Sequence, residues 1–410
     1  MPRLPAARIC CLDLDTFFVS VERLLDPTLE GKPVIVGGKK GQRGVVTAAS
    51  YEVRAFGVRS GMSMVKASKL APDAIYLSTR HGEYSSWSAK VMELARDVCP
   101  QVAPASIDEA YMDFTGCEGI YTKTEDRDGD ATVLRVVQEL RHRIQDELGL
   151  PASVGIGSTR AIAKMASGHA KPAGVWMVDV GDEEDFVDLL PVRAYPGIGP
   201  VSGGKLAKAG LHTLGQLLRV EPGPLRARFG DQAERVRRGI DGSQHTTVRR
   251  RPAFREHDPQ SVTVGSISNE RTFSADVGDD QKVEDQIRAL AERVCWRARK
   301  RGIRSRTIGL KLRYSDFHTI TRSKTIAATD LEEDVFREVL ALFRKARTRT
   351  LAIRLVGVQL SNLVGPEQQL LLPFDKETTH VGQALDDVRK LFGYDAIRLG
   401  HVGKGGSWLA

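Results

Sequence analysis

The segment between residues 261 and 360 constrains the fold most strongly, because strand-like and helical hydrophobic periodicities alternate along it in a regular order. Apolar residues at every second position over 307–314 are typical of a half-buried strand, and helical spacing over 279–301 is typical of an amphipathic helix. Thr329 and Glu332 have the spacing of a capping box for a second helix, which extends to residue 347. We therefore expect an α+β unit of order βαββαβ, with strands at 261–272, 307–314, 318–326 and 352–360.

The distribution of basic residues indicates a polyanionic partner. Lys311 and Arg313 alternate with the apolar residues of strand 307–314, so they should lie on the open face of the sheet, where they could contact phosphates. The net charge is +8, and one basic run at 249–251 precedes this part of the chain while a second, at 297–306, lies within it. Each run alone is typical of a solvated face, but together they favour nucleic acid as a partner.

Composition excludes several classes of protein. Hydrophobic residues make up 41% and charged residues 27% of the 410-residue chain, which is ordinary for globular domains. No apolar run is long enough to span a membrane, and residues 1–15 lack the apolar core of a secretory signal. The five cysteines form no CxxC pair, so neither a zinc site nor a disulfide framework is indicated. We expect a cytoplasmic, multidomain monomer that contacts no membrane.

Three carboxylates are the strongest chemical signal in the sequence. Asp13 lies near the end of a strand-like segment at 7–15, whereas Asp108 and Glu109 separate two strand-like runs and could occupy a hairpin tip. Carboxylates on rigid strand ends suit phosphoryl transfer with two Mg²⁺ ions, because Mg²⁺ prefers oxygen ligands. Asp15 shares the face of Asp13, and we expect it to support that residue. Exposed turn acids that bind no metal are the alternative.

Two strings around these acids resemble motifs of the Y-family of translesion DNA polymerases, and most of all its DNA polymerase IV branch. The strings are DLDTFFVSVE at 13–22 and ASIDEAYMD at 105–113. The resemblance implies two Mg²⁺ ions per active site. It also implies that the ions are bound by Asp13, Asp108 and Glu109, with the Leu14 carbonyl as an added ligand.

The same resemblance implies residues that bind a deoxynucleoside triphosphate. Phe18 stands where the family has a steric gate against the ribose 2′-hydroxyl, although a core phenylalanine is the alternative. The string TAASYEVRAFGV at 47–58 resembles the fingers motif, and Tyr51 and Arg54 share a helix face there. A triphosphate needs positive charge and donors around it. The implied phosphate contacts are Thr47, Tyr51, Arg54 and, in HAKPAG at 169–174, Lys171.

The resemblance implies a right-hand polymerase and extends over about residues 7–375. Pro-Gly-Ile-Gly before a helix resembles a helix-hairpin-helix, in which Gly197 and Gly199 would let backbone N–H groups approach DNA phosphates. The expected parts are a palm at 1–21 and 81–172, small fingers at 22–80, a helical thumb at 173–244, a basic linker at 245–260, a βαββαβ little finger at 261–363 and a tail at 364–410.

The tail contains a short apolar run followed by an amphipathic helix at 381–392. The run resembles the peptide by which proteins bind the bacterial sliding clamp, and a stub packed on the preceding domain is the alternative. The residues implied in clamp binding are Gln369, Leu370, Leu372 and Phe374. No function is indicated for the helix, whose apolar side is expected to comprise Ala384, Leu385, Val388 and Leu391.

These features together predict a template-directed DNA polymerase that adds dNTPs to a primer–template DNA. Low fidelity and translesion synthesis in the damage response are implied by the resemblance, and no segment predicts a proofreading exonuclease domain. Three alternatives remain at this point. They are a nucleotide cyclase with a similar palm, a DNA-binding protein with an inactive site, and another Y-family branch of the mutasome-subunit type.

Overall fold

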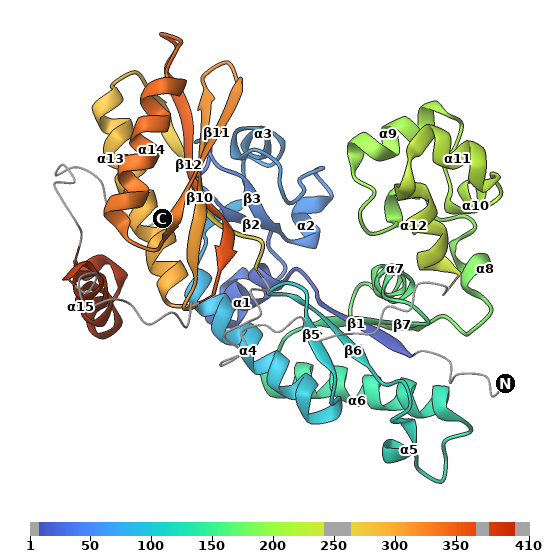
Figure 1. Ribbon diagram of the computed structural model, residues 1–410. Helices are drawn as coiled ribbons and strands as arrows, with labels where there is room; N and C mark the ends of the chain where they lie inside the picture. The colour runs from blue at the N-terminus through green and yellow to red at the C-terminus, as the bar shows by residue number, and fades with distance from the viewer. Residues whose placement is uncertain (1–7, 242–263, 366–376, 398–410) are drawn as a thin grey trace. The chain divides into compact units, whose positions relative to one another are not determined.

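A computed structural model describes residues 8–241, 264–365 and 377–397, and the chain divides into two compact units at residues 1–253 and 254–410 (Figure 1). The division falls inside the predicted basic linker, which lies outside the described residues. A search of the described helices finds none with the length and apolar character needed to cross a membrane. All five cysteines, which belong to the described part, are free thiols.

The first unit is built around a five-stranded sheet that carries the acidic residues. One face of the sheet is covered by α4 (His81–Val98) and α6 (Gly129–Leu148), and the other by α7 (Arg160–Ala170) (Figure 1). Cys10 and Leu12 pack in the core on the α4 and α6 face, whereas Ile9 and Cys11 pack with Ala163 of α7. Because side chains alternate along a strand, Asp13 points to the α7 side. The strand order is β5 (Val102–Pro104), β6 (Glu109–Asp113), β1 (Ile9–Leu14), β7 (Ala152–Gly157) and β8 (Val175–Met177).

Glycine allows α7 to lie directly on the sheet. A Cβ atom on Gly155 of β7 would lie 2.0 Å from the Ala163 carbonyl oxygen and 2.1 Å from the Ser167 nitrogen. Thr159 caps the helix by accepting a hydrogen bond from the Ile162 N–H at 3.1 Å. The sequence pattern predicts a helix over residues 160–170, and the structure confirms these bounds. The close approach of α7 places its polar residues beside the acidic end of β1.

The segment expected to form the fingers has a small core of its own, which includes Ile35, Val53 and Met64. It begins within α1 (Phe17–Leu25). The short runs at 32–38 and 45–48 predict two strands in this segment, and both are confirmed. The third strand and the second helix were not predicted, because neither shows a clear period. The elements are β2 (Val34–Gly37), β3 (Val46–Ala49), α2 (Tyr51–Arg54), α3 (Met64–Leu70) and β4 (Ile75–Ser78).

The region expected to form the thumb at 173–244 is helical from Glu183 onward, as predicted, but its first strand, β8, belongs to the central sheet. Its core also takes in Ile162 and Met165 of α7. The polar, glycine-containing sequence at 117–131 predicts a loop, which is wrong in part, because the segment contains α5 (Glu118–Tyr121) and the first turn of α6, which Asp128 caps. The thumb helices are α8 (Glu183–Val187), α9 (Pro200–Lys208), α10 (Leu214–Leu218), α11 (Pro222–Phe229) and α12 (Asp231–Ile240).

The second unit confirms the βαββαβ order. Its sheet has the order β11-β10-β12-β9, with α13 and α14 packed on one face (Figure 1). The capping box was wrong, because Thr329 accepts a hydrogen bond from the Leu331 N–H and Leu331 takes the cap position of α14. The elements are β9 (Ser266–Val277), α13 (Asp280–Arg299), β10 (Arg304–Tyr314), β11 (Thr319–Thr329), α14 (Glu332–Ala346) and β12 (Ile353–Val364).

Helix α15 (Glu377–Phe392) docks on this unit through ion pairs. Arg389 is fully buried and contacts Glu292 of α13 at 3.1 Å, and Arg299 of α13 contacts Asp386 of α15 at 2.7 Å. The predicted apolar side is wrong in part, because Ala384 and Leu391 are exposed while Leu385 and Arg389 are buried. Charge pairing therefore sets the orientation of this helix.

Candidate active site

The structure brings the three predicted carboxylates together at one end of the central sheet. Asp13 on β1 lies directly opposite Glu109 on β6 in the antiparallel register. Asp108 occupies the turn just before β6, where its carbonyl accepts a hydrogen bond from the Leu14 N–H at 2.9 Å. The Ser106 hydroxyl donates to the Asp108 carboxylate within the same turn. The hairpin-tip interpretation is confirmed, and residues nearly a hundred positions apart share one site.

Asp15 anchors the end of the strand, which agrees with the supporting role expected for it. Its side chain is 1% exposed and accepts hydrogen bonds from the Ser153 hydroxyl and the Ala173 N–H, both at 2.7 Å. These contacts join β1 to β7 and to the turn after α7. Asp15 therefore holds the backbone that carries Asp13 and Leu14 in place.

Two lysines neutralise the acidic cluster. Lys171 pairs with Asp13 and lies 3.5 Å from Asp15, whereas Lys164 pairs with Glu109 and lies 3.7 Å from the other oxygen of Asp13. Lys171 was predicted from the sequence to belong to this site, but Lys164 was not. The ammonium groups offset repulsion that would otherwise arise between the opposed carboxylates.

Burial and charge act against each other on these groups. Burial raises the pKa of Asp13, the charge of Asp108 adds to this rise, and Lys171 and Lys164 oppose it. Burial alone would lower the pKa of the Lys164 ammonium, but its hydrogen bond to Glu109 and the nearby acidic groups raise the pKa overall. The pKa of Lys171 is raised in the same way by Asp13, against the effect of burial. The site is thus a set of strongly coupled charges.

The oxygen donors fit a hard divalent cation. Among the described residues, no set of three or more His, Cys, Asp or Glu side chains is arranged to hold a metal ion as it stands. Lys164 instead places a positive charge against both Asp13 and Glu109, where a cation would contact the same two carboxylates. Carboxylate and carbonyl oxygens are the ligands that Mg²⁺ prefers. The set of Asp13, Leu14, Asp108 and Glu109 is therefore suitable for Mg²⁺.

Of the residues predicted to bind phosphates, Tyr51 and Arg54 are the first and last residues of α2, and Thr47 lies on the preceding strand β3. Ser50 caps this helix, and the Arg54 guanidinium stands 4.9 Å from the Tyr51 ring centroid while its Nε donates to the Ala49 carbonyl at 3.0 Å. Burial raises the pKa of Tyr51, and the negative charge of Asp15 adds to the rise. The Tyr51 phenol therefore interacts electrostatically with the acidic cluster. Thr47 lies half-buried on β3. Tyr51 also raises the pKa of Lys171, so Tyr51 and Lys171 share one electrostatic environment.

Phe18 is the second residue of α1, and its ring is partly accessible to solvent. Phe17 is buried in the core, as expected, whereas Phe18 is only partly buried and stacks on Tyr84 with ring centroids 4.1 Å apart and planes at 13°. The Tyr84 hydroxyl donates to the buried Glu22 carboxylate at 2.6 Å, and Arg80 pairs with the same carboxylate. Tyr84 therefore orients Phe18, a contact that no sequence pattern indicated.

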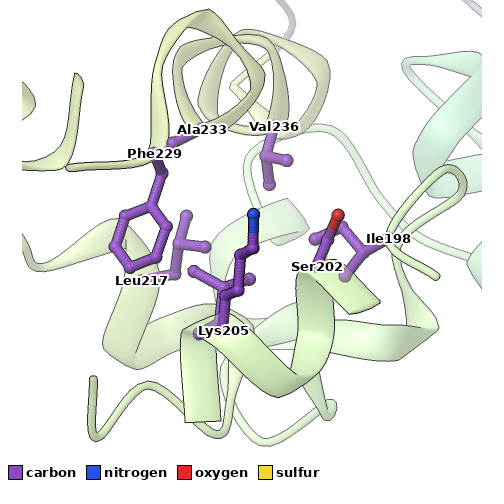
Figure 2. A pocket seen from close by; sticks show the side chains of 8 residues that line it. Ile198, Ser202, Lys205, Leu217, Phe229, Ala233 and Val236 are labelled. Atoms are coloured by element: carbon purple, nitrogen blue, oxygen red, sulfur yellow. The ribbon is translucent and has the colours of Figure 1, made fainter. Parts of the chain in front are cut away.

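The predicted hairpin in the thumb is present between short helical segments. Gly197 has φ of 97°, a conformation that suits glycine, and Gly199 caps α9. Between them, the buried side chain of Ile198 lines a pocket of about 140 Å³, among whose side chains Lys205 extends (Figure 2). Packing of Ile198 in the thumb core therefore holds the hairpin in position. The pocket is lined by Ile198, Ser202, Lys205, Leu206, Leu217, Phe229, Ala233 and Val236.

Lys311 and Arg313 lie on the open sheet face, as predicted, but each has a partner there. Gly357 of β12 lacks a side chain, so Lys311 of β10 and Glu270 of β9 meet across it at 2.8 Å. Arg313 donates from Nε to the Thr319 hydroxyl at 2.9 Å. The clamp-binding prediction for Gln369, Leu370, Leu372 and Phe374 lies outside the described residues.

Lys164 and Tyr84 are the site residues that sequence reasoning missed. Lys164 stands seven positions before Lys171, which places both on the segment that follows the acidic strands, and that proximity was the available signal. Tyr84 lies on α4, for which no helix was predicted. Each acts through a contact between elements more than fifty residues apart in the chain.

Comparisons with known proteins agree across the whole chain. A family model described as the impB/mucB/samB family matches residues 12–168, and the model of that family's C-terminal domain matches residues 264–372. DNA polymerase IV of Dehalococcoides mccartyi (strain CBDB1) is 34% identical over 398 residues, which is 96% of this chain and 97% of that protein. DNA polymerase IV of Desulfatibacillum aliphaticivorans is 36% identical over 396 residues, 94% of each chain.

Solved structures support the same fold. The Y-family DNA polymerase chimera Dbh-Dpo4(243-245)-Dbh has a TM-score of 0.75 and 23% identity, covering 87% of this chain and 99% of its own. DinB from Sulfolobus solfataricus has a TM-score of 0.56 at the same identity and coverage. The near full-length match to the relatives decides the family. The chain therefore belongs to the Y-family DNA polymerases of the impB/mucB/samB type, in the DNA polymerase IV branch, and is a DNA-directed DNA polymerase.

Proposed function

We propose that this polymerase extends a primer by two-metal phosphoryl transfer at Asp13, Asp108 and Glu109, with low fidelity, and that it serves translesion synthesis in damage tolerance. The observation that carries the proposal is the register that sets Asp13 opposite Glu109, with Asp108 in the adjoining turn. Opposed carboxylates at a sheet end suit cation-assisted phosphoryl transfer better than a structural role, because they repel each other unless a positive charge lies between them.

The residues of the site divide the work by their chemistry. Asp13, Asp108, Glu109 and the Leu14 carbonyl would hold two Mg²⁺ ions, which when bound activate the primer 3′-hydroxyl and stabilise the charge on the transferred and leaving groups. The cationic and phenolic groups of Lys171, Arg54 and Tyr51, with the Thr47 hydroxyl, would orient the triphosphate of the incoming dNTP. Asp15 keeps the strand end rigid, because its buried carboxylate accepts two hydrogen bonds from other elements.

Low fidelity follows from the small fingers and from what the described domains contain. The fingers core is a small cluster packed on a three-stranded sheet, so few contacts to a nascent base pair are expected. The described parts of the chain are accounted for by palm, fingers, thumb, little finger and α15. No described domain is therefore left for a proofreading exonuclease.

Primer–template DNA is expected to contact the hairpin at Gly197 and Gly199 and the open sheet face with Lys311 and Arg313. The hairpin offers backbone N–H groups and the sheet offers charge, and neither reads sequence. The bacterial sliding clamp is a further proposed partner, through the tail motif at 369–374. A monomer in the cytoplasm completes the proposal.

The test is primer extension on a defined template with Mg²⁺ and the four dNTPs, beside the same template with one abasic site. Distributive extension on both templates, with frequent misincorporation opposite the intact template, is expected. DNA binding without any extension would instead support a binding protein with an inactive site. Extension that always stops before the abasic site would contradict the translesion role.

Replacement of Phe18 by alanine is expected to relax sugar selection. A 2′-hydroxyl forced against an aromatic ring costs about 1–3 kcal/mol, so the ratio of kcat/KM for dNTP over rNTP should fall by roughly tenfold to a hundredfold. The ratio is measured by single-nucleotide insertion, with Phe18→Leu as an intermediate case. Unchanged discrimination in an active Phe18→Ala enzyme would show that the ring is only a packing residue.

A further inference from the structure

We infer that Lys164 is a positioning residue that substitutes for a divalent cation between Asp13 and Glu109 and gives up Asp13 when the cation binds. This role rests on the proposed metal site but adds a residue that the site's motifs do not include. The observation behind it is that one ammonium group contacts two directly opposed carboxylates, which repel each other unless a positive charge lies close to both.

The position of Lys164 is built into the fold. Helix α7 touches the sheet where Gly155 allows it, and this contact directs Lys164 toward the ends of β1 and β6. Its ammonium reaches Glu109 directly and lies 3.7 Å from Asp13 Oδ2. One positive charge thereby contacts both members of a directly opposed carboxylate pair.

Lys164 and Lys171 are not equivalent. Lys171 contacts the Oδ1 atom of Asp13 and lies close to Asp15, on the side of the site toward Tyr51. Lys164 contacts Glu109 and the Oδ2 atom of Asp13, so it alone of the two bridges the strands. Its side chain is 34% exposed, which leaves the flexible stem free to move toward solvent.

An ammonium and a Mg²⁺ ion that use the same oxygens must compete. Removing the Lys164 ammonium should therefore lower the stability of the protein in the absence of Mg²⁺. It should also raise the affinity of the site for Mg²⁺. An opposite charge at this distance commonly shifts a charge-dependent equilibrium by one to three powers of ten, so a change of about tenfold in Mg²⁺ affinity is expected. The longer contact to Asp13 is the one expected to break, because the Glu109 contact is the closer of the two.

The experiment measures Tm of the full chain as Mg²⁺ is added, without DNA or nucleotide. Lys164→Met should lower Tm in Mg²⁺-free buffer, and its Mg²⁺ midpoint should fall about tenfold below that of the wild type. Lys164→Arg should behave like the wild type, because it keeps the charge. Lys123→Met is the matched control, since Lys123 forms a lysine–glutamate pair with Glu139 at 3.1 Å on the surface, and it should leave the midpoint unchanged.

Three results would overturn the inference. An unchanged Mg²⁺ midpoint in Lys164→Met, or in Lys164→Gln if the methionine variant does not fold, would show that Lys164 does not compete with the cation. A raised KM for dNTP with an unchanged midpoint would place Lys164 on the substrate phosphates instead. Mg²⁺ should raise the Tm of the wild type, and Asp13→Asn should abolish that rise. If the wild type shows no such rise, or if Asp13→Asn keeps it, the proposed metal site itself is wrong, and this outcome is distinguishable from the first two results.

Discussion

Asp108→Ala is expected to lower the rate of primer extension by roughly a thousandfold while leaving the fold and DNA binding intact. Metal-assisted charge stabilisation supplies several kcal/mol of the barrier reduction, and about 4 kcal/mol corresponds to that factor. The fold should survive because the Asp108 carboxylate contacts only the Ser106 hydroxyl of its own turn among the hydrogen bonds found for it. The structural contact to Leu14 comes from the Asp108 backbone carbonyl, which alanine keeps.

Single-turnover extension with saturating Mg²⁺ and dNTP measures the loss, and Tm and DNA affinity are measured on the same samples. Asp97→Ala is the matched control, because Asp97 is a 60% exposed acid that lies 3.4 Å from Arg143 on the palm surface. It should be neutral within about 0.5 kcal/mol. Activity that survives in Asp108→Ala would show that Asp108 is not part of the catalytic site. A Tm that falls together with the activity would show that the substitution acts by destabilising the fold.

The acidic site could be predicted from the sequence because its signals are local. Asp13 ends a strand of clear two-residue period, and Asp108 and Glu109 interrupt two strand-like runs. The periodicity also predicted the βαββαβ unit, since Ile308, Leu310, Leu312 and Tyr314 alternate and are all buried. Each of these inferences needed only the residues of one segment.

Lys164 and α15 could not be predicted, because their roles depend on packing between distant elements. In the sequence, Lys164 has no feature that distinguishes it from other lysines on helices. Its place in the site depends on the close packing of α7 on the sheet at Gly155. Arginine is seldom buried, so the expected inward side of α15 was its apolar stripe. In the structure Arg389 points inward instead, because Glu292 supplies a buried negative charge that only a cation can balance.

Arg389→Met is expected to weaken the docking of α15 by about 3–5 kcal/mol, because it removes the buried cation that pairs with the buried carboxylate of Glu292. Glu292 is only 1% exposed, and it accepts a hydrogen bond from Arg389 at 3.1 Å. Tyr394, just beyond the helix, also packs against the Arg389 guanidinium at 4.9 Å. Amide hydrogen exchange of residues 382–392 measures the effect, and protection there should fall by roughly a hundredfold or more.

Two further variants separate charge burial from general damage to the helix. Lys390→Met changes the exposed neighbour of Arg389 and should leave protection unchanged. Glu292→Met combined with Arg389→Met should recover much of the lost protection, because an apolar pair in place of a buried ion pair is often neutral in stability. If the double variant is no better than Arg389→Met alone, loss of the ion pair between Arg389 and Glu292 is not the cause of the lost protection. The contact of Arg389 with Glu332 of α14 at 3.5 Å would then be what keeps α15 docked.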